Sequence, residues 1–323
     1  MTELQLVSVA QLIDRTHEEK ARGEKPRSYI GASVMGNKCD RWIWLSFRWA
    51  VFEQFEGRML RLFRRGHNEE KTVIEDLEAI GITVTRQQEG IDFGCHVRGH
   101  IDGVVSGLKE SSKPHILEIK THNLKSFNEL EKKGVREAKP VHYAQMQAYM
   151  RGLGIERTLY VAVCKDDDRL YVERVRYDKG FSESNAREFK EGSVERAQRI
   201  ALEDRAPVRI SENPTWYECK MCACHDICHG SKLTKNVNCR TCAHSTARAD
   251  STWYCERWGS EIPRDGQLTG CPSHVLHPDL VPWKMDSIGE PWHVAYGETV
   301  NGNPDEMAGA VSSEEIVRRN NGS

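Results

Sequence analysis

Apolar positions along the chain up to about residue 210 recur with two different periods. Helical spacing of the apolar residues between Leu4 and Ile13 predicts an amphipathic helix over residues 3–20. Further helices are predicted over an aromatic-rich stretch at residues 40–64, over 68–80 before Gly81, over 140–152 after Pro140, and over a long polar stretch at 181–204. Alternation of apolar and polar residues predicts strands over residues 82–88, 91–98, 100–106 and 115–121, and a hairpin formed by residues 158–164 and 170–177.

The strand predicted over residues 115–121 separates two kinds of side chain. Leu117, Glu118, Ile119 and Lys120 alternate between apolar and polar. Residues two apart on a strand share a face, so Glu118 and Lys120 point together while Leu117 and Ile119 point into a core. A carboxylate and an ammonium group at one strand end can hold a divalent cation and a water molecule in one place.

This order of elements predicts an α/β fold for the chain up to about residue 210. Residues 211–283 are rich in Cys, Trp and Pro with little periodicity, which is typical of a segment held together by metal ions. Residues 284–323 are polar and lack a sustained apolar period, so we expect a mobile tail. The predicted domains are therefore a core over residues 1–232, a small Cys-rich module over 233–283 and a flexible tail over 284–323.

Composition places the chain among ordinary soluble proteins. It has 323 residues, of which 38% are hydrophobic and 29% charged. No apolar run is long enough to span a bilayer, and the first residues lack the pattern of a secretory signal. We therefore expect a cytoplasmic protein (in the host cytoplasm if a phage encodes it) with no membrane partner. The net charge of −2 indicates no particular class of ligand.

One stretch of the chain is locally basic. Residues 39–65 contain six Arg and three acidic residues, and Arg58, Arg61 and Arg65 lie at helical spacing. With the tryptophans at positions 42, 44 and 49, they could form a groove that stacks bases and follows phosphates. Two alternatives to this groove stay open. Aromatic residues at this density mostly belong to the core, and a solvated helix face explains the arginines equally well.

A set of residues with the chemistry of a metal-dependent nuclease runs through the predicted core. The set consists of His67, Asp102, Glu118, Ile119, Lys120, Gln145 and Tyr149. Mg²⁺ takes oxygen ligands and keeps several waters, so a few carboxylates suffice to bind it, and lysine is a compact cation that fits beside it. Single members have simpler explanations: Glu-x-Lys pairs occur by chance, Asp102 suits a turn, and Glu69 or Glu70 could replace His67.

In order and spacing, this set resembles the RecB-like branch of the PD-(D/E)XK nuclease superfamily, and is most similar to its iron–sulfur exonucleases, the CRISPR-associated, AddB-type and related phage nucleases. The resemblance implies a restriction-endonuclease-like core, with a mixed central sheet flanked by helices. It also implies that Mg²⁺ or Mn²⁺ is bound by His67, Asp102, Glu118 and the carbonyl group of Ile119. Lys120 would orient the attacking water, and Gln145 and Tyr149 would support the site and the DNA backbone.

Eight of the eleven cysteines form two clusters, and in a reducing compartment such spacing indicates metal ligands. The first cluster has the form C-x2-C-x5-C. The resemblance implies that it binds a [4Fe–4S] cluster together with one upstream cysteine, the ligands being Cys39, Cys219, Cys222 and Cys228. Zn²⁺ is the alternative metal. Cys224 is an additional cysteine that departs from the family pattern, and it could replace Cys222 or Cys228 or be a bystander.

The second cluster consists of Cys239, Cys242, Cys255 and Cys271. One C-x2-C pair followed by two well-spaced cysteines suits a small tetrahedral zinc site, in which a nearby histidine could replace one thiolate. A module of this size builds little core, so metal binding would supply most of its folding free energy. It could contact DNA or a protein partner, and a purely structural role is an equal alternative.

Together these observations predict a Mg²⁺- or Mn²⁺-dependent DNA nuclease that acts in recombination, repair or phage DNA processing. The resemblance favours an exonuclease over an endonuclease. The expected partners are DNA, as single strands or duplex ends, and a recombination or replication protein. Two alternatives belong to other classes: a catalytically silent nuclease-like iron–sulfur subunit that holds DNA, and a metal-binding adaptor.

Overall fold

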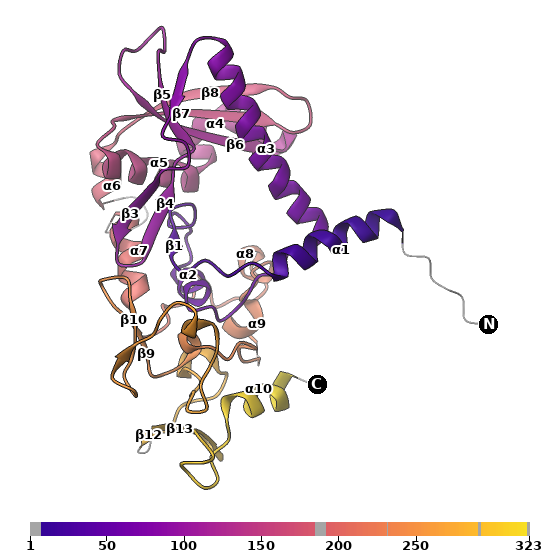
Figure 1. Cartoon of the computed structure of the whole chain (residues 1–323), viewed down its shortest axis with the longest axis vertical. Coiled ribbons are helices and arrows are strands. Elements are labelled where there is room, and N and C mark those ends of the chain that lie inside the picture. The colour runs from indigo at the N-terminus through magenta and orange to yellow at the C-terminus, as the bar shows by residue number, and fades with distance from the viewer. Residues whose placement is uncertain (1–7, 185–191, 231, 290–291, 322–323) are drawn as a thin grey trace, which may run out of the picture. The chain divides into compact units, whose positions relative to one another are not determined.

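The computed structural model describes residues 8–184, 192–230, 232–289 and 292–321. The chain forms two compact units and passes between them several times. Unit 1 consists of Met1–Arg27, Gln54–Asp92 and Arg98–Ser193, and unit 2 of Ser28–Glu53, Phe93–Val97 and Val194–Ser323. These units differ from the predicted domains, because residues 28–53 belong with the C-terminal half of the chain (Figure 1).

A five-stranded sheet forms the centre of unit 1. Its strands are β2 (Thr83–Thr85), β5 (Gly103–Ser106), β6 (His115–His122), β7 (Arg157–Cys164) and β8 (Leu170–Arg176), in the spatial order β2-β5-β6-β7-β8. Only β6 and β7 pair in parallel, and the other neighbours in this sheet are antiparallel. The sheet is therefore mixed, and helices flank it, which confirms the predicted mixed α/β architecture.

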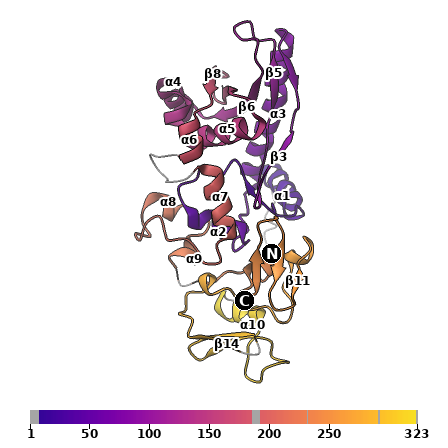
Figure 2. The same cartoon turned by 90° about the vertical axis from the view of Figure 1, so that its left-hand side faces the viewer.

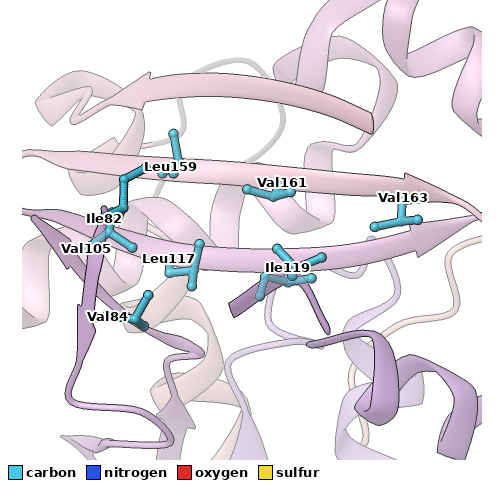
Figure 3. Packing of buried hydrophobic residues seen from close by; sticks show 9 residues of the cluster. Ile82, Val84, Val105, Leu117, Ile119, Leu159, Val161 and Val163 are labelled. Carbon is cyan, nitrogen blue, oxygen red and sulfur yellow. The ribbon is translucent and has the colours of Figure 1, made fainter. Parts of the chain in front are cut away.

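An aliphatic cluster covers one face of this sheet. Leu117 and Ile119 belong to it together with Leu159, Val161 and Val163 on the neighbouring strand β7 (Figure 3). Val73 of helix α3 (Gly57–Ala79) closes the cluster from outside the sheet. The alternating pattern of β6 thus produces the predicted apolar face, and it leaves Glu118 and Lys120 on the opposite face.

Helices lie on both sides of the sheet in unit 1. Figure 2 shows α3 on one side and α4 (Leu124–Ala138) with α5 (Pro140–Leu153) on the other. Helix α1 (Val9–Arg22) packs against α3, and α6 (Lys179–Ser184) follows β8. α5 was predicted almost to the residue, because Pro140 opens it and Gly154, at φ 65°, closes it. α4 was not predicted, and its polar sequence contains a non-helical Gly134.

Two predicted helices differ from those observed. The chain forms α2 (Asp40–Phe47) and the long α3, not helices over residues 40–64 and 68–80. After α2, Trp49 takes a left-handed conformation at φ 54°, which ends the helix before residue 50. At Gly57, the first residue of α3, α1 passes so close that a Cβ atom would lie 2.5 Å from Cβ of Asp14, so this position requires glycine.

Two other predicted helices fall partly outside the described residues. These are the helix over residues 3–20, whose part before residue 8 is not described, and the helix over 181–204, whose residues 185–191 are not described. In the described part, the helix predicted over residues 181–204 corresponds to two helices, α6 and α7 (Ser193–Leu202). No described helix combines the length and the apolar character that crossing a membrane requires.

Unit 2 contains short elements. Strands β3 (Gly90–Gly94) and β4 (Val97–His100) lie where the chain passes from one unit to the other. The remaining elements before residue 270 are β1 (Ile30–Gly31), α2, α7, α8 (Tyr217–Lys220), α9 (His225–Cys228), η1 (Cys239–Thr241), β9 (Ser245–Ala247), β10 (Trp253–Cys255), β11 (Ser260–Glu261) and η2 (Gly266–Leu268). Strands β9, β10 and β11 form an antiparallel sheet in the order β11-β10-β9.

The described part of residues 284–323 is folded, so the prediction of a mobile tail over this range is corrected. After η3 (Pro278–Leu280), β12 (Ser287–Gly289), β13 (His293–Tyr296) and β14 (Thr299–Asn301) form an antiparallel sheet that is followed by α10 (Ser313–Asn321). Val294 and Ile316 are buried in two small apolar clusters with Leu233, Leu276 and Val275. These residues are widely spaced along the chain, which is why no apolar period revealed them.

A buried guanidinium group joins two of the three sequence segments of unit 2, residues 28–53 and 194–323. Arg240 is 1% exposed and donates hydrogen bonds to the carbonyl groups of Phe47 at 2.8 Å and Ser28 at 2.9 Å. Two further N–H groups donate to the side-chain oxygen of Gln267, and the guanidinium lies 3.8 Å from the ring centroid of Trp49. The aromatic residues of the basic stretch that surround it are therefore core, as one of the two alternatives predicted.

Candidate active site

Glu118 and Lys120 project from the polar face of β6 and form an ion pair. Glu118 is fully buried, whereas Lys120 keeps about a quarter of its side chain exposed (27%). Burial raises the pKa of Glu118 to about 7, against the lowering effect of Lys120. Burial alone would lower the pKa of Lys120, but the carboxylates of Glu118 and Asp102 raise it above its usual value.

Asp102 reaches the same place from the turn that precedes β5. Its Oδ2 accepts a hydrogen bond from the backbone N–H of Ile119 at 2.7 Å, between the two charged residues of β6. Burial raises the pKa of the Asp102 carboxyl group, while Lys120 and the Ile119 N–H act against this. Asp102 is therefore more than a turn residue, because its side chain is anchored on the neighbouring strand.

Helix α3 contributes a third carboxylate, Glu70, near Asp102 and Glu118. Burial, and then the nearby Asp102, raise the pKa of Glu70, while His67 and Lys120 lower it. His67 lies one turn earlier on the same helix and is exposed. The structure thus brings Glu70 as well as His67 toward Asp102, and the i, i+3 spacing from His67 was the signal for it.

Gln145 and Tyr149 line the site from α5. The hydroxyl of Tyr149 donates to the carbonyl oxygen of His100 at 2.8 Å, and the amide nitrogen of Gln145 donates to that hydroxyl at 3.1 Å. Both side chains are buried, and the Oε1 atom of Gln145 has no hydrogen-bond partner in the described residues. The predicted helical face is confirmed, and it holds the segment just before Asp102.

The oxygens of Glu118 fit a divalent cation. Both are buried, and apart from the ion pair with Lys120 neither has a hydrogen-bond partner among the described residues. A buried carboxylate in this state is costly unless a cation or a donor compensates it. Nevertheless, no three His, Cys, Asp or Glu side chains in the described ranges are grouped so that they could hold a metal ion. The observed candidate is therefore the carboxylate pair of Glu118 and Asp102, and a ligand role of His67 stays a prediction.

Residues 8–229 match the family described as the PD-(D/E)XK nuclease superfamily. This range is more than half of the chain and includes every residue of the site. The chain belongs to the PD-(D/E)XK nuclease superfamily. No curated protein matches the sequence at a significant level.

Three solved structures are similar to this superfamily member. The crystal structure of SSO0001 has a TM-score of 0.40 at 15% identity, and the match covers 69% of this chain and 96% of that one. An alkaline exonuclease from Laribacter hongkongensis has a TM-score of 0.35 at 18% identity, with coverage of 58% and 90%. The same exonuclease in complex with dAMP has a TM-score of 0.34 at 15% identity, with coverage of 55% and 85%. Superfamily membership rests on the family match.

Two of the three arginines predicted to bind DNA are bonded to neighbouring segments of this PD-(D/E)XK protein. Arg61 pairs with Asp14 of α1 at 3.0 Å, and Arg65 donates to the carbonyl oxygen of Lys165 at 2.8 Å. Arg58 is exposed. Two of the three therefore hold neighbouring segments of unit 1, and DNA binding by this helix face stays a prediction.

The first cysteine set lies within unit 2. Burial raises the pKa of Cys39, and the thiols of Cys222 and Cys228 raise it further. Burial also raises the pKa of Cys219, followed by the effects of Cys228 and Cys222. A hydrogen bond from the buried Cys224 lowers the pKa of Cys222 to about 6. The fold thus brings the thiols near one another without grouping them as a metal site.

The second cysteine set is also brought together in unit 2. Burial raises the pKa of Cys239 to about 11, with further contributions from Cys271 and Cys255. The thiol of Cys239 donates to the carbonyl oxygen of Thr269 at 3.3 Å. Burial raises the pKa of Cys242 to about 12. In the described residues these thiols form no metal site, so a metal-stapled C-terminal region is not shown.

Proposed function

We propose that this protein is a metal-dependent deoxyribonuclease that hydrolyses phosphodiester bonds with Mg²⁺ or Mn²⁺. The observation that carries the proposal is the convergence of Asp102, Glu118 and Lys120 around one strand end. Two of the three are acidic, and apart from Lys120 the oxygens of Glu118 have no hydrogen-bond donor within the described chain. Membership of the PD-(D/E)XK nuclease superfamily supports the same activity.

The residues divide the work by their chemistry. Glu118 and Asp102 supply carboxylate oxygens to a hard cation, with the backbone carbonyl of Ile119 and, from α3, His67 or Glu70 as further candidate ligands. A bound divalent cation would stabilise negative charge on the phosphate and lower the pKa of a water molecule. Lys120 orients the attacking water and offsets charge on the scissile phosphate in the transition state. Gln145 and Tyr149 keep the segment before Asp102 in position.

Comparison of two single-residue variants with the parent tests this function. The Glu118→Ala variant should lower the rate of DNA degradation with Mn²⁺ by about 1000-fold, because it removes a carboxylate at the reacting phosphate. The matched control is Glu129→Ala, which removes a carboxylate that is 48% exposed on α4. Equal digestion of end-labelled DNA by parent and Glu118→Ala would contradict the proposal. Binding of DNA without cleavage by the parent would favour the silent-subunit alternative.

We further propose that the enzyme is an exonuclease acting in recombination, repair or phage DNA processing. This part rests on the resemblance to iron–sulfur exonucleases. An exonuclease requires an end, so the parent should degrade linear DNA and leave covalently closed circular DNA of the same sequence intact. Linearisation of the circle by the parent would identify an endonuclease instead.

The cysteine sets carry the remaining proposals, a [4Fe–4S] cluster on Cys39, Cys219, Cys222 and Cys228 and a zinc ion on Cys239, Cys242, Cys255 and Cys271. Neighbouring soft thiolates support both metals. In anaerobically purified protein, Cys219→Ser should lose the brown chromophore and much of the soluble yield, while Cys95→Ser, outside both sets, should retain them. Unchanged absorbance and iron content in Cys219→Ser would remove this residue from the ligand set.

A further inference from the structure

A buried hydrogen-bonded network lies on the same sheet face as Glu118 and Lys120. His122 is the next residue on this face of β6, and Tyr160 of β7 pairs directly with Glu118. The hydroxyl of Tyr160 lies 3.0 Å from Nε2 of His122 and 3.0 Å from Nδ1 of His142. Tyr160 is 0% exposed, so its hydroxyl has these two imidazoles as its partners within the described chain. None of these residues was predicted from the sequence.

The hydrogen bonds of this network all run from donor to acceptor in one direction, which Lys139 fixes. The ammonium group of Lys139 can only donate, so the hydroxyl oxygen of Ser126, at 2.7 Å, accepts from it. The Ser126 hydroxyl lies 3.2 Å from Nδ1 of His122. Because a cation favours O–H and N–H dipoles that point away from it, the Ser126 proton is directed to His122. His122 then carries its proton on Nε2 and donates to Tyr160.

The same donor-to-acceptor direction continues from His122 through Tyr160 to His142, the last residue of the network. Tyr160 has one hydroxyl proton, and because it accepts from His122 it donates that proton to Nδ1 of His142. His142 is therefore the tautomer that carries its proton on Nε2. Burial first, and then nearby ammonium groups, lower the pKa of His122 to about 4 and that of His142 to about 3. Both imidazoles are thus neutral at neutral pH, and the protonated Nε2 of His142 is the free donor at the end.

The position of His142 points this donor toward the candidate active site. His142 precedes Gln145 by three residues and Tyr149 by seven, so the three share one face of α5. Lys120 is the charged group that most affects the pKa of His142 after burial. His142 is partly exposed, and its Nε2 has no hydrogen-bond partner in the part of the chain that the structure describes.

We propose that Nε2–H of His142 donates a hydrogen bond to a non-bridging oxygen of a DNA phosphate at this site, and that Tyr160 and His122 orient it. The contact rests on the proposed nuclease function. A phosphate is the ligand of choice because Lys120, Lys139 and Lys165 all act on the network and favour an anion. A neutral imidazole adds a directed donor to this surrounding without adding a further positive charge.

A set of four variants tests the contact. We expect His142→Phe to weaken both DNA binding and kcat/KM by about 10- to 100-fold, the effect of losing a hydrogen bond to a charged group. His142→Gln retains an N–H donor and should recover part of the loss, whereas Tyr160→Phe removes only the orienting group and should cause a smaller one. His115→Phe is the control. His115 is a buried histidine on β6, the strand that also carries His122, but it is bonded to the carbonyl of Lys113 and lies outside the network.

Binding should be measured with Ca²⁺, so that affinity is obtained without cleavage. The probe is a single-stranded oligonucleotide in which one phosphate at a time is replaced by a neutral methylphosphonate. At the contacted phosphate this replacement should weaken binding by the parent and have little further effect on His142→Phe. Equal affinity of parent and His142→Phe, or an equal loss in His115→Phe, would overturn the contact while leaving the nuclease function intact.

Long-range ¹H–¹⁵N correlation spectra provide a readout that is independent of activity. They should show His142 with its proton on Nε2 in the parent and a mixture of tautomers in Tyr160→Phe. A proton on Nδ1 of His142 in the parent would overturn the proposed orientation, whatever the enzyme does to DNA. A parent that neither binds nor cleaves DNA would overturn the proposed function together with the contact.

Discussion

Each unit of the molecule buries charged side chains, but the partners differ. In unit 1 the oxygens of Glu118 have the ammonium group of Lys120 beside them and no hydrogen-bond donor in the described residues. In unit 2 the guanidinium of Arg240 donates to Phe47, Ser28 and Gln267 and is stacked on aromatic rings. Burial lowers the pKa of Arg240 to about 9, so it remains charged at neutral pH.

The difference separates a buried charge that serves a ligand from one that serves the fold. A buried cation such as Arg240 has most of its donors bonded to the protein, and its partners come from distant parts of the chain. A buried carboxylate such as Glu118, which has only Lys120 beside it in the described residues, lowers stability, and we propose that its oxygens bind a cation. The aliphatic cluster on the opposite face of the sheet stabilises unit 1 and so offsets that cost.

The largest expected effect concerns the charged pair of unit 1. Lys120→Met should reduce the rate of DNA cleavage by about 1000-fold, because it removes the cation beside the scissile phosphate. The Met side chain keeps the apolar stem, so far-UV circular dichroism should be unchanged. Steady-state assays with Mn²⁺ give the rate, and Lys133→Met on α4 is the control. A Lys120→Met enzyme with parental kcat would show that the pair in unit 1 is structural, like the buried arginine of unit 2.

The corresponding change in unit 2 should affect stability. Arg240→Met should lower the free energy of unfolding by about 3 kcal/mol, because it leaves buried carbonyl groups without donors. Arg205→Met is the control: Arg205 is 70% exposed and pairs with Asp279, so its loss should cost less than about 1 kcal/mol. Urea unfolding followed by tryptophan fluorescence measures both. Similar losses of unfolding free energy in the two variants would contradict a structural role of the buried Arg240 that the exposed Arg205 lacks.

Divalent cations should stabilise unit 1 through Glu118. At about 100 times the dissociation constant, Mn²⁺ should raise the free energy of unfolding of the parent by about 2.7 kcal/mol. The Glu118→Gln variant should respond much less, because its amide binds the cation poorly. Differential scanning calorimetry with and without Mn²⁺ measures the shift in Tm. An equal shift in both proteins would mean that the cation binds elsewhere.

The smallest expected effect is a pH dependence that originates in unit 2. His274 is 2% exposed, near the hydroxyl of Ser313 and the carbonyl of Asn238, and burial lowers its pKa to about 4. The unfolded chain then takes up the proton first, so stability falls as the pH decreases from about 6.5 toward 4, by about 2.5 kcal/mol. His274→Asn should flatten this part of the curve of unfolding free energy against pH, while the exposed His100→Asn should not. An unchanged slope in His274→Asn would contradict the assignment.

Parts of the fold and site were predictable because they depend on local geometry. The alternation at Leu117 to Lys120 correctly placed two residues in the core and two on the polar face. Pro140 and Gly154 bounded α5, and the spacing of Gln145 and Tyr149 placed them on one face of it. The order of the motifs along the sequence predicted Asp102, Glu118 and Lys120 as residues of the candidate active site. Glu70 was considered only as a substitute for His67.

Other features were not predictable because they depend on contacts between distant residues. The break between α2 and α3 follows from a left-handed Trp49 and from the close passage of α1 at Gly57. The C-terminal strands and α10 are held by apolar residues that are far apart along the chain. The network around Tyr160 joins residues from β6, β7, α4 and α5, so no spacing in a single segment reveals it.

By itself the sequence determined which side chains share a face, since the periods of strand and helix are properties of the local backbone. It therefore determined that Glu118 lies beside Lys120 and that Gln145 lies beside Tyr149. Only the tertiary structure decided that Glu118 is buried with no donor but Lys120 in the described residues, that Asp102 binds the amide of Ile119 and that Arg240 joins two segments of unit 2. Burial and long-range hydrogen bonds depend on how separate elements pack, and the local order of residues does not encode that packing.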